Sequence, residues 1–230
     1  MDSDPLLIKM RQPTLFGLSE TSSDILELFP ALWGAAEELT SPELDIRQAA
    51  LKRLAVMNAP RLSPLIAYLV ASRITEPDLA LRTRVVQLLS EILAPDKDGQ
   101  PAPESVIRHL SASLAQMRTR SMVALLQVAA LDPGSASLAA RLFNACPYGG
   151  TQLAEILSDR KAPLEIRRQA AQMIGLVGYL DALPTLDRLE TRLSVRLNGQ
   201  QSMPFALSSG PDESELLPVI QNTIEMLRSV

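Results

Sequence analysis

The sequence predicts an all-α protein. Helical hydrophobic periodicity runs through nearly all of its 230 residues, and no segment shows the apolar–polar alternation of a half-buried strand. Hydrophobic residues make up 47% of the chain, aromatic residues only 3%, and the formal net charge is -4. This composition is too hydrophobic and too weakly charged for a disordered chain, and the length is ample for a continuous core. We therefore expect a folded helical protein.

Helices are expected between clusters of Pro, Gly, Ser and Asp, where the periodic segments stop. Several segments begin with a capping residue or an early proline, as at Pro42, Asp78, Pro163 and Asp212. The connections are short, which favours antiparallel packing of successive helices. The expected helices are 24–39, 43–57, 61–74, 78–94, 103–117, 119–131, 135–145, 150–159, 163–178, 181–197 and 212–229.

Two stretches interrupt the helical pattern. Residues 1–22 are mixed in composition, and residues 198–211 are interpreted as a loop inserted between the last two helices of a domain that spans 23–230. Each stretch either caps an end of the helical domain or docks a partner. The first stretch has apolar residues at Leu6, Leu7, Ile8, Leu15 and Phe16. The second has them at Met203, Pro204, Phe205 and Leu207.

Three segments align without gaps around an arginine. They are SPELDIRQAALKRLA around Arg47, EPDLALRTRVVQLLS around Arg82 and KAPLEIRRQAAQMIG around Arg167. Each has a proline four or five residues before the arginine, and apolar or small residues at offsets that share one helical face. The first two arginines are 35 residues apart, and the 85 residues to the third leave room for further units, one of them around Arg120. This recurrence indicates stacked helical repeats, with the aligned arginines bracing neighbouring units.

The repeat resembles HEAT repeats, the antiparallel helix pairs of armadillo-type α-solenoids, which carry a proline and an arginine near the start of the second helix. The clearest unit is 150–190, where Gly175 and Gly178 stand at positions that are commonly small and let helices approach closely. The resemblance covers residues 24–197 and, less clearly, 212–229. The family's acidic residue six positions before the arginine is present only as Glu76, and the helix at 135–145 has no pairing partner. The resemblance implies an α-solenoid of about four to six helix pairs.

Candidates for catalysis or metal binding are few. Cys146 and His109 are the single cysteine and the single histidine, so a disulfide framework is excluded and a Cys/His zinc site within one chain is not expected. We interpret His109 as a structural or surface residue and Cys146 as a buried small hydrophobe. Gly149 and Gly150 are interpreted as a helix start, and the motifs HExxH, CxxC and GxSxG are absent. We expect no catalytic site, no cofactor and no metal.

Two groups of basic residues stand out within the second half of the chain. Three arginines recur every four residues from Arg188 to Arg196, along one expected helix face, and a second group lies around the turn at 160–168. Arginine forks suit carboxylates and phosphates, so an acidic partner segment is one interpretation. In the other, the stripe is a solvated face that pairs with Asp187 and Glu190. The candidate partner-binding residues are Arg160, Lys161, Arg168, Arg188, Arg192 and Arg196.

The expected function is that of a non-catalytic interaction or scaffold module that binds a protein partner along its helical surface. The net charge of -4 argues against a nucleic-acid partner. The longest apolar stretch, 123–131, is too short for a membrane span, and with the acidic N-terminus this favours a cytoplasmic location.

An enzyme or modification factor is the alternative, because the resemblance extends to two HEAT-like classes. Bilin lyases attach tetrapyrroles to phycobiliproteins, and only the generic repeat connects them with this chain. Alkylpurine DNA glycosylases use a basic concave face and several tryptophans, whereas this acidic chain has one tryptophan, Trp33. A deep pocket with a perturbed carboxylate would favour this alternative, and a smooth surface would favour the scaffold.

Overall fold

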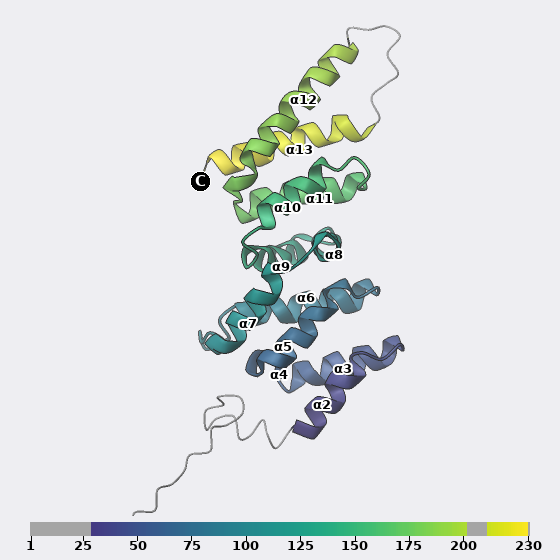
Figure 1. Cartoon of the computed structure of the whole chain (residues 1–230), viewed down its shortest axis with the longest axis vertical. Helices are drawn as coiled ribbons and strands as arrows, with labels where there is room; N and C mark the ends of the chain where they lie inside the picture. Colours follow the sequence, from purple (N-terminus) through teal and green to yellow (C-terminus); the bar gives the residue numbers. More distant parts are fainter. Residues whose placement is uncertain (1–28, 202–210, 230) are drawn as a thin grey trace, which may run out of the picture.

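Helices account for the regular structure of this protein. The computed structural model describes residues 29–201 and 211–229, and these residues contain helices and no strand. Successive helices follow the long axis of the molecule in the order of the sequence (Figure 1). The α-helices are α2 (Phe29–Glu38), α3 (Leu44–Val56), α4 (Ala59–Leu62), α5 (Pro64–Ala71), α6 (Leu79–Leu93), α7 (Glu104–Ala115), α8 (Thr119–Ala129), α9 (Pro133–Asn144), α10 (Gly149–Ser158), α11 (Leu164–Val177), α12 (Leu183–Gln201) and α13 (Pro211–Arg228). Two 3-10 turns, η2 (Ser72–Thr75) and η3 (Leu180–Ala182), precede α6 and α12.

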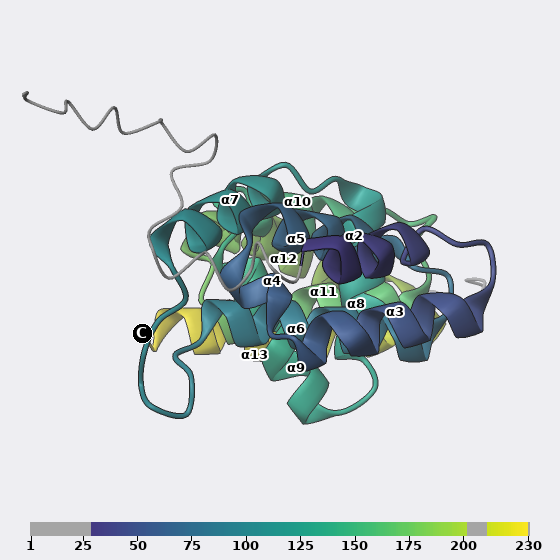
Figure 2. The ribbon, with the colours of Figure 1, turned by 90° about the horizontal axis from the view of Figure 1, so that it is seen from below.

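The helices form two layers and, within the described residues, five successive groups. Seen along the long axis, α2, α5, α7 and α10 lie on one side, which we call layer A, and α3, α6, α9 and α13 lie on the other, layer B (Figure 2). Four groups pair α2 with α3, α4 and α5 with α6, α10 with α11, and α12 with α13. The remaining group pairs α8 with α9; α9 also packs on α6, and α7 packs on α5 of the preceding group. The helix expected at 135–145 therefore has partners, namely α8 and α6.

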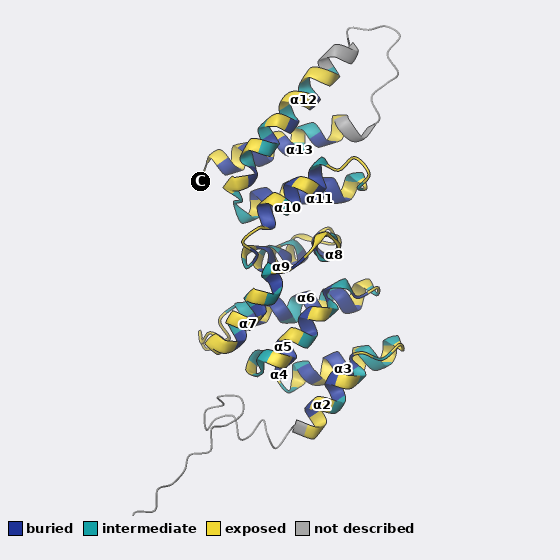
Figure 3. Ribbon diagram, in the orientation of Figure 1, coloured by how far each residue is buried: buried dark blue, intermediate teal, exposed yellow. Residues whose placement is uncertain are grey.

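One continuous apolar core joins these groups. Buried residues gather where neighbouring helices meet, along the whole length of the stack (Figure 3). Helices α7, α8 and α9 supply seven of the twelve largest fully buried side chains. These seven are Leu110, Leu114, Met122, Leu125, Leu126, Leu142 and Phe143.

The observed helices match the expected ones closely, with two differences. The expected helix 61–74 is divided at Ser63, because Pro64 lacks the backbone N–H that would continue α4, and the Ser63 hydroxyl accepts from the Ile66 N–H at 3.4 Å to start α5. Helix α12 continues through Gln201, so residues 198–201 of the expected insert are helical, and α13 begins at Pro211. Residues 1–28, which include the expected N-terminal stretch, and residues 202–210 lie outside the described residues.

Two of the aligned arginines join neighbouring groups, as expected. Arg47 of α3 donates from Nε and Nη2 to the carboxylate of Glu76, at 3.2 and 2.6 Å, and Glu76 is only 3% exposed. Arg82 of α6 donates to the side chain of Gln127 on α8 and, at 2.7 Å, to the backbone carbonyl of Glu76. Burial lowers the pKa of Arg82, while the carboxylates of Glu76 and Asp78 oppose that shift, so the guanidinium stays charged.

The other two arginines of the expected repeat differ from this pattern. Arg167 of α11 is 3% exposed and donates from Nε to the carbonyl of Leu157 at 2.9 Å, a bond that lies within one helix group. Arg120, expected to mark a divergent unit, is exposed in the first turn of α8. Besides the Arg82–Gln127 bond, a further tie between the second and third groups comes from Arg141 of α9, which donates to the carbonyl of Ser90 at 3.2 Å.

A glycine allows a close approach where α10 begins. A Cβ on Gly149 would overlap the hydroxyl of Tyr179, which follows α11. That hydroxyl donates to the carbonyl of Phe143 and, at 3.2 Å, to the carbonyl of Cys146, and so satisfies groups at the end of α9. Burial raises the pKa of Tyr179, so its hydroxyl keeps its proton. Gly149 therefore starts α10, as expected, and also makes room for this cap.

The two glycines of the clearest repeat have different roles. At Gly175, α11 lies close to α13 as its position predicts, and a Cβ there would meet the side chains of Thr223 and Met226 at 3.4 Å, an ordinary van der Waals contact. Gly178 has open space around it and a φ of +82°, the left-handed conformation that ends α11. The expectation of close approach is therefore wrong for Gly178, whose role is to adopt the positive φ that ends α11.

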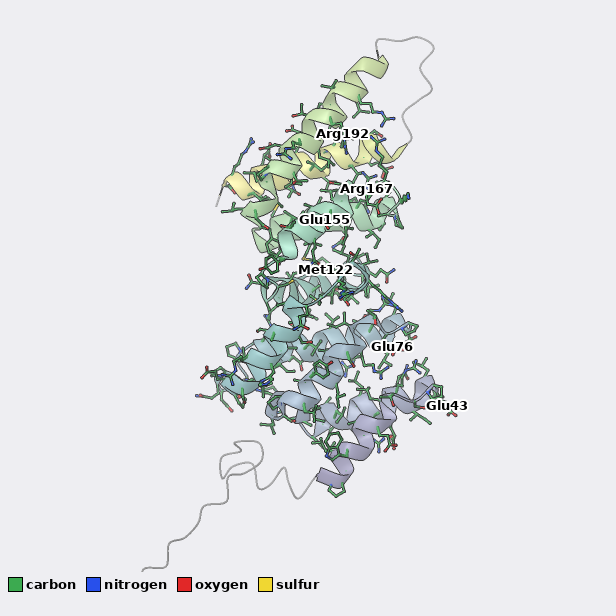
Figure 4. All side chains as sticks on the ribbon, in the orientation of Figure 1. Glu43, Glu76, Met122, Glu155, Arg167 and Arg192 are labelled. Carbon is green, nitrogen blue, oxygen red and sulfur yellow. The ribbon has the colours of Figure 1, made fainter. Side chains whose placement is uncertain are left out.

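Replacing Glu76 with alanine should lower the free energy of unfolding by about 2–4 kcal/mol, because Arg47 loses its buried charged partner. A double-mutant cycle with Arg47→Ala, measured by urea denaturation, should give a coupling of about 1–3 kcal/mol. Glu155→Ala on the exposed side of α10 is the matched control (Figure 4) and should change stability by less than about 0.5 kcal/mol. Equal effects of Glu76→Ala and Glu155→Ala would contradict the role of the pair.

Gly149→Ala should lower the free energy of unfolding by about 1–3 kcal/mol, because the new methyl displaces the Tyr179 hydroxyl from the carbonyls that it caps. Gly34→Ala is the control within a helix, since a Cβ there meets nothing within 4 Å. That change should raise stability by about 0.5–1 kcal/mol, because alanine is the better helix former. Urea denaturation curves of the two variants should therefore shift in opposite directions.

Candidate binding surface

Three of the predicted site residues lie together on α12. Arg188, Arg192 and Arg196 follow one exposed face of the helix, as residues four positions apart do. With Asp187, Thr191 and Val195 they border an open surface region of about 560 Å³, and all the described residues around it belong to α12. Val195 is 67% exposed. We call Arg188, Thr191, Arg192, Val195 and Arg196 the α12 stripe; Arg192 is labelled in Figure 4.

The acidic residues beside the stripe face α13 instead. Asp187 accepts a hydrogen bond from Arg228 at 2.9 Å, and Glu190 accepts one from the side-chain amide of Gln221 at 3.1 Å. The interpretation in which Asp187 and Glu190 pair with the arginines of the stripe is therefore wrong, because α13 packs on α12 and takes both carboxylates. Within the described residues, Arg188 and Arg192 have no hydrogen-bond or ion-pair partner.

The other three predicted site residues lie apart from the stripe. Arg160 and Lys161 are exposed in the turn between α10 and α11, where the Asp159 carboxylate accepts the Lys161 N–H at 2.9 Å. Arg168 is half-exposed and forms an ion pair with Glu165 at 2.6 Å, one turn away on α11. Helix α13 packs against both α11 and α12 and lies between the α12 stripe and the basic residues at 160–168. The six residues therefore form two separate basic surfaces.

The candidates for catalysis occupy ordinary structural positions. His109 is exposed on α7, and its Nδ1 lies 2.7 Å from the carbonyl oxygen of Ser105, so it is the surface residue that the sequence predicts. Cys146 is 1% exposed, which confirms it as a buried residue, and burial raises the pKa of its thiol. Among the side chains that the structure describes, no three His, Cys, Asp or Glu residues are grouped to hold a metal ion.

Two features of the surface were not predicted from the sequence. Helix α5 exposes Leu65 and Tyr68, and Leu62 is exposed just before it; the signal was the uncharged run from 64 to 71. A shallow groove of about 270 Å³ lies between α3 and α6, with Lys52 and Arg84 among its lining residues. This groove joins helices that are far apart in sequence, so periodicity within either helix did not indicate it.

None of the helices within residues 29–201 and 211–229 is both long enough and apolar enough to span a membrane.

Comparison with protein-family models, curated proteins and solved structures finds no match to this chain.

The thiol of Cys146 should react with Ellman's reagent at least about tenfold more slowly in the native protein than in urea, because burial limits access and raises the thiol pKa, leaving less thiolate. Since it is the single cysteine, one rate reports the site. A Cys146→Ala/Val56→Cys variant provides the exposed control, as Val56 is 79% exposed, and should react rapidly while folded. A fast native reaction of Cys146 would contradict the packing around the end of α9.

Proposed function

We propose that this chain is a HEAT-like α-solenoid that acts as a non-catalytic interaction module in the cytoplasm and binds a protein partner along its helical surface. The stacking of helix groups along one axis supports the proposal, because neighbouring groups share one core while their outer faces stay open. The ties from Arg47, Arg82 and Arg141 between successive groups support it further, since they hold the groups in a fixed order.

The observation that carries the proposal is the pair of cations Arg188 and Arg192 on the α12 stripe. Arg188 and Arg192 lack acidic partners within the described residues, while Asp187 and Glu190 face α13. Val195, an exposed apolar side chain, lies three residues after Arg192 on the same helix. Guanidinium groups bind carboxylates through paired hydrogen bonds, and a nearby apolar contact adds area that loses water on binding. The partner that fits is therefore a protein segment with acidic residues around an apolar one.

The exposed turn at Arg160 and Lys161, together with Arg168, supplies a second basic contact on the far side of α13. An extended acidic partner that crosses α13 engages both surfaces. A compact partner engages the α12 stripe alone.

The test is affinity capture from the native lysate, with nuclease treatment, by the wild type and two charge-reversal variants. Arg188→Glu/Arg192→Glu should reduce recovery of a stoichiometric protein partner at least about tenfold, because two attractive contacts become repulsive. Arg118→Glu/Arg120→Glu makes the same charge change at two exposed positions, one just before α8 and one in its first turn, and should retain the partner. Circular dichroism of all three proteins should be the same.

Salt provides a second readout, since recovery by the wild type should fall as ionic strength rises from about 0.05 to 0.5 M. Equal recovery by both variants would overturn the assignment of the stripe. Recovery that nuclease abolishes would indicate nucleic-acid binding of the glycosylase kind. A coloured eluate with tetrapyrrole absorbance would indicate a bilin-lyase-like factor.

A further inference from the structure

Helix α5 has apolar residues on all of its faces. Its sequence is PLIAYLVA, with no charged residue. Ile66, Ala67, Val70 and Ala71 are buried against the core. The opposite side carries Leu65 and Tyr68, which are 45% and 53% exposed, and Leu62 just before the helix is 39% exposed. A helix that is apolar all round is normally covered on every side. We call Leu62, Leu65 and Tyr68 the α5 strip.

Two other helices of layer A, α7 and α10, have more polar outer faces, whereas α2 exposes Trp33, which is 37% exposed. Helix α7 presents Arg108 and His109 to solvent, and α10 presents Thr151 and Glu155. Those outer faces are polar, as expected for a solvated surface. The nearest charged residue in the sequence, Arg61, is engaged elsewhere, because its guanidinium donates to carbonyls of the α6–α7 connection, among them that of Ala94 at 3.0 Å. The α5 strip is therefore an uncharged apolar surface that a partner with apolar side chains would cover.

A second copy of the chain is a poor occupant for this surface. A stable dimer buries about 800 Å² on each partner, and three partly exposed side chains with polar surroundings fall well short of that area. A segment of the same chain can bind through a smaller area, because its covalent tether lowers the entropic cost that association of separate molecules carries.

The chain holds a segment of suitable length and composition. Twenty-eight residues precede Phe29, where α2 begins, and α2 and α5 belong to successive groups of layer A (Figures 1 and 2). Fully extended, 28 residues reach about 90 Å, so the tether does not limit access to α5. The apolar residues of this segment include Leu6, Leu7, Ile8, Leu15 and Phe16.

We propose that residues 1–28 dock on the α5 strip of the same chain and cover it with the apolar side chains between Leu6 and Phe16. The contact is apolar and independent of the α12 stripe, which lies at the other end of the molecule (Figure 1). Its failure would leave the proposed function untouched.

Photo-crosslinking in the full chain tests the proposal. Tyr68→p-benzoylphenylalanine places a photoreactive ketone on the strip at an exposed position, so the fold is not disturbed. After irradiation, peptide mapping should find crosslinks from position 68 to residues 1–28. The same group at Leu176, which is 50% exposed on α11, is the control and should not reach residues 1–28. Absence of the crosslink from position 68 would overturn the proposal.

Isotope mixing separates docking within one chain from docking between chains. In an equal mixture of unlabelled and nitrogen-15-labelled chains, both peptides of each crosslinked pair should be unlabelled or both should be labelled. Crosslinks with mixed labels would show a second copy on the strip and would overturn docking within the chain.

A variant of the segment gives an independent readout. Leu6→Ser/Leu7→Ser/Ile8→Ser should reduce the crosslink yield from position 68 at least about fivefold, because the apolar contacts are lost. Ser3→Ala/Gln12→Ala/Thr21→Ala changes three polar positions of the same segment and should retain the yield. An unchanged yield in the first variant would contradict docking through these apolar side chains.

Discussion

The carboxylate of Glu76 is buried where the first two helix groups meet, and it accepts two hydrogen bonds from Arg47 while the backbone carbonyl of the same residue accepts one from Arg82. Apolar contact is non-directional, so it favours stacking of the groups without choosing how they are turned. Charged hydrogen bonds are directional, and a buried carboxylate without its partner is costly. This cluster therefore fixes how the first group sits on the second, and Gln127 extends the constraint to the third.

The limits of the helices could be predicted because their signals are local. Pro133, Gly149 and Pro211 act on the backbone within a few residues, and the helices begin where these residues stand. The division at Ser63 is also local, but a strong apolar run concealed it. The third group could not be predicted from a pairwise repeat, because the partners of α9 lie on α6 and α8 and are chosen by packing between groups.

The candidate site was predictable to the same extent. A spacing of four residues was enough to place Arg188, Arg192 and Arg196 on one face of a helix. What their acidic neighbours do was not predictable, since Asp187 and Glu190 bond to residues of α13, which lies beyond the following connection. Judged from the sequence of α12 alone, Asp187 and Glu190 could pair with arginines of the same helix or with residues of another helix. The packing of α13 on α12 decides which of these groups they bond to, and so decides whether Arg188 and Arg192 have acidic partners.

The packing at the middle of the chain has a consequence for local opening. Helices α7, α8 and α9 supply most of the largest fully buried side chains, and described helices pack on both sides of them. Densely packed segments have the highest free energy of local opening, whereas segments near the ends of a chain open more easily. Partial unfolding should therefore begin in the outer helices, and the central helices should keep their structure until the whole protein unfolds.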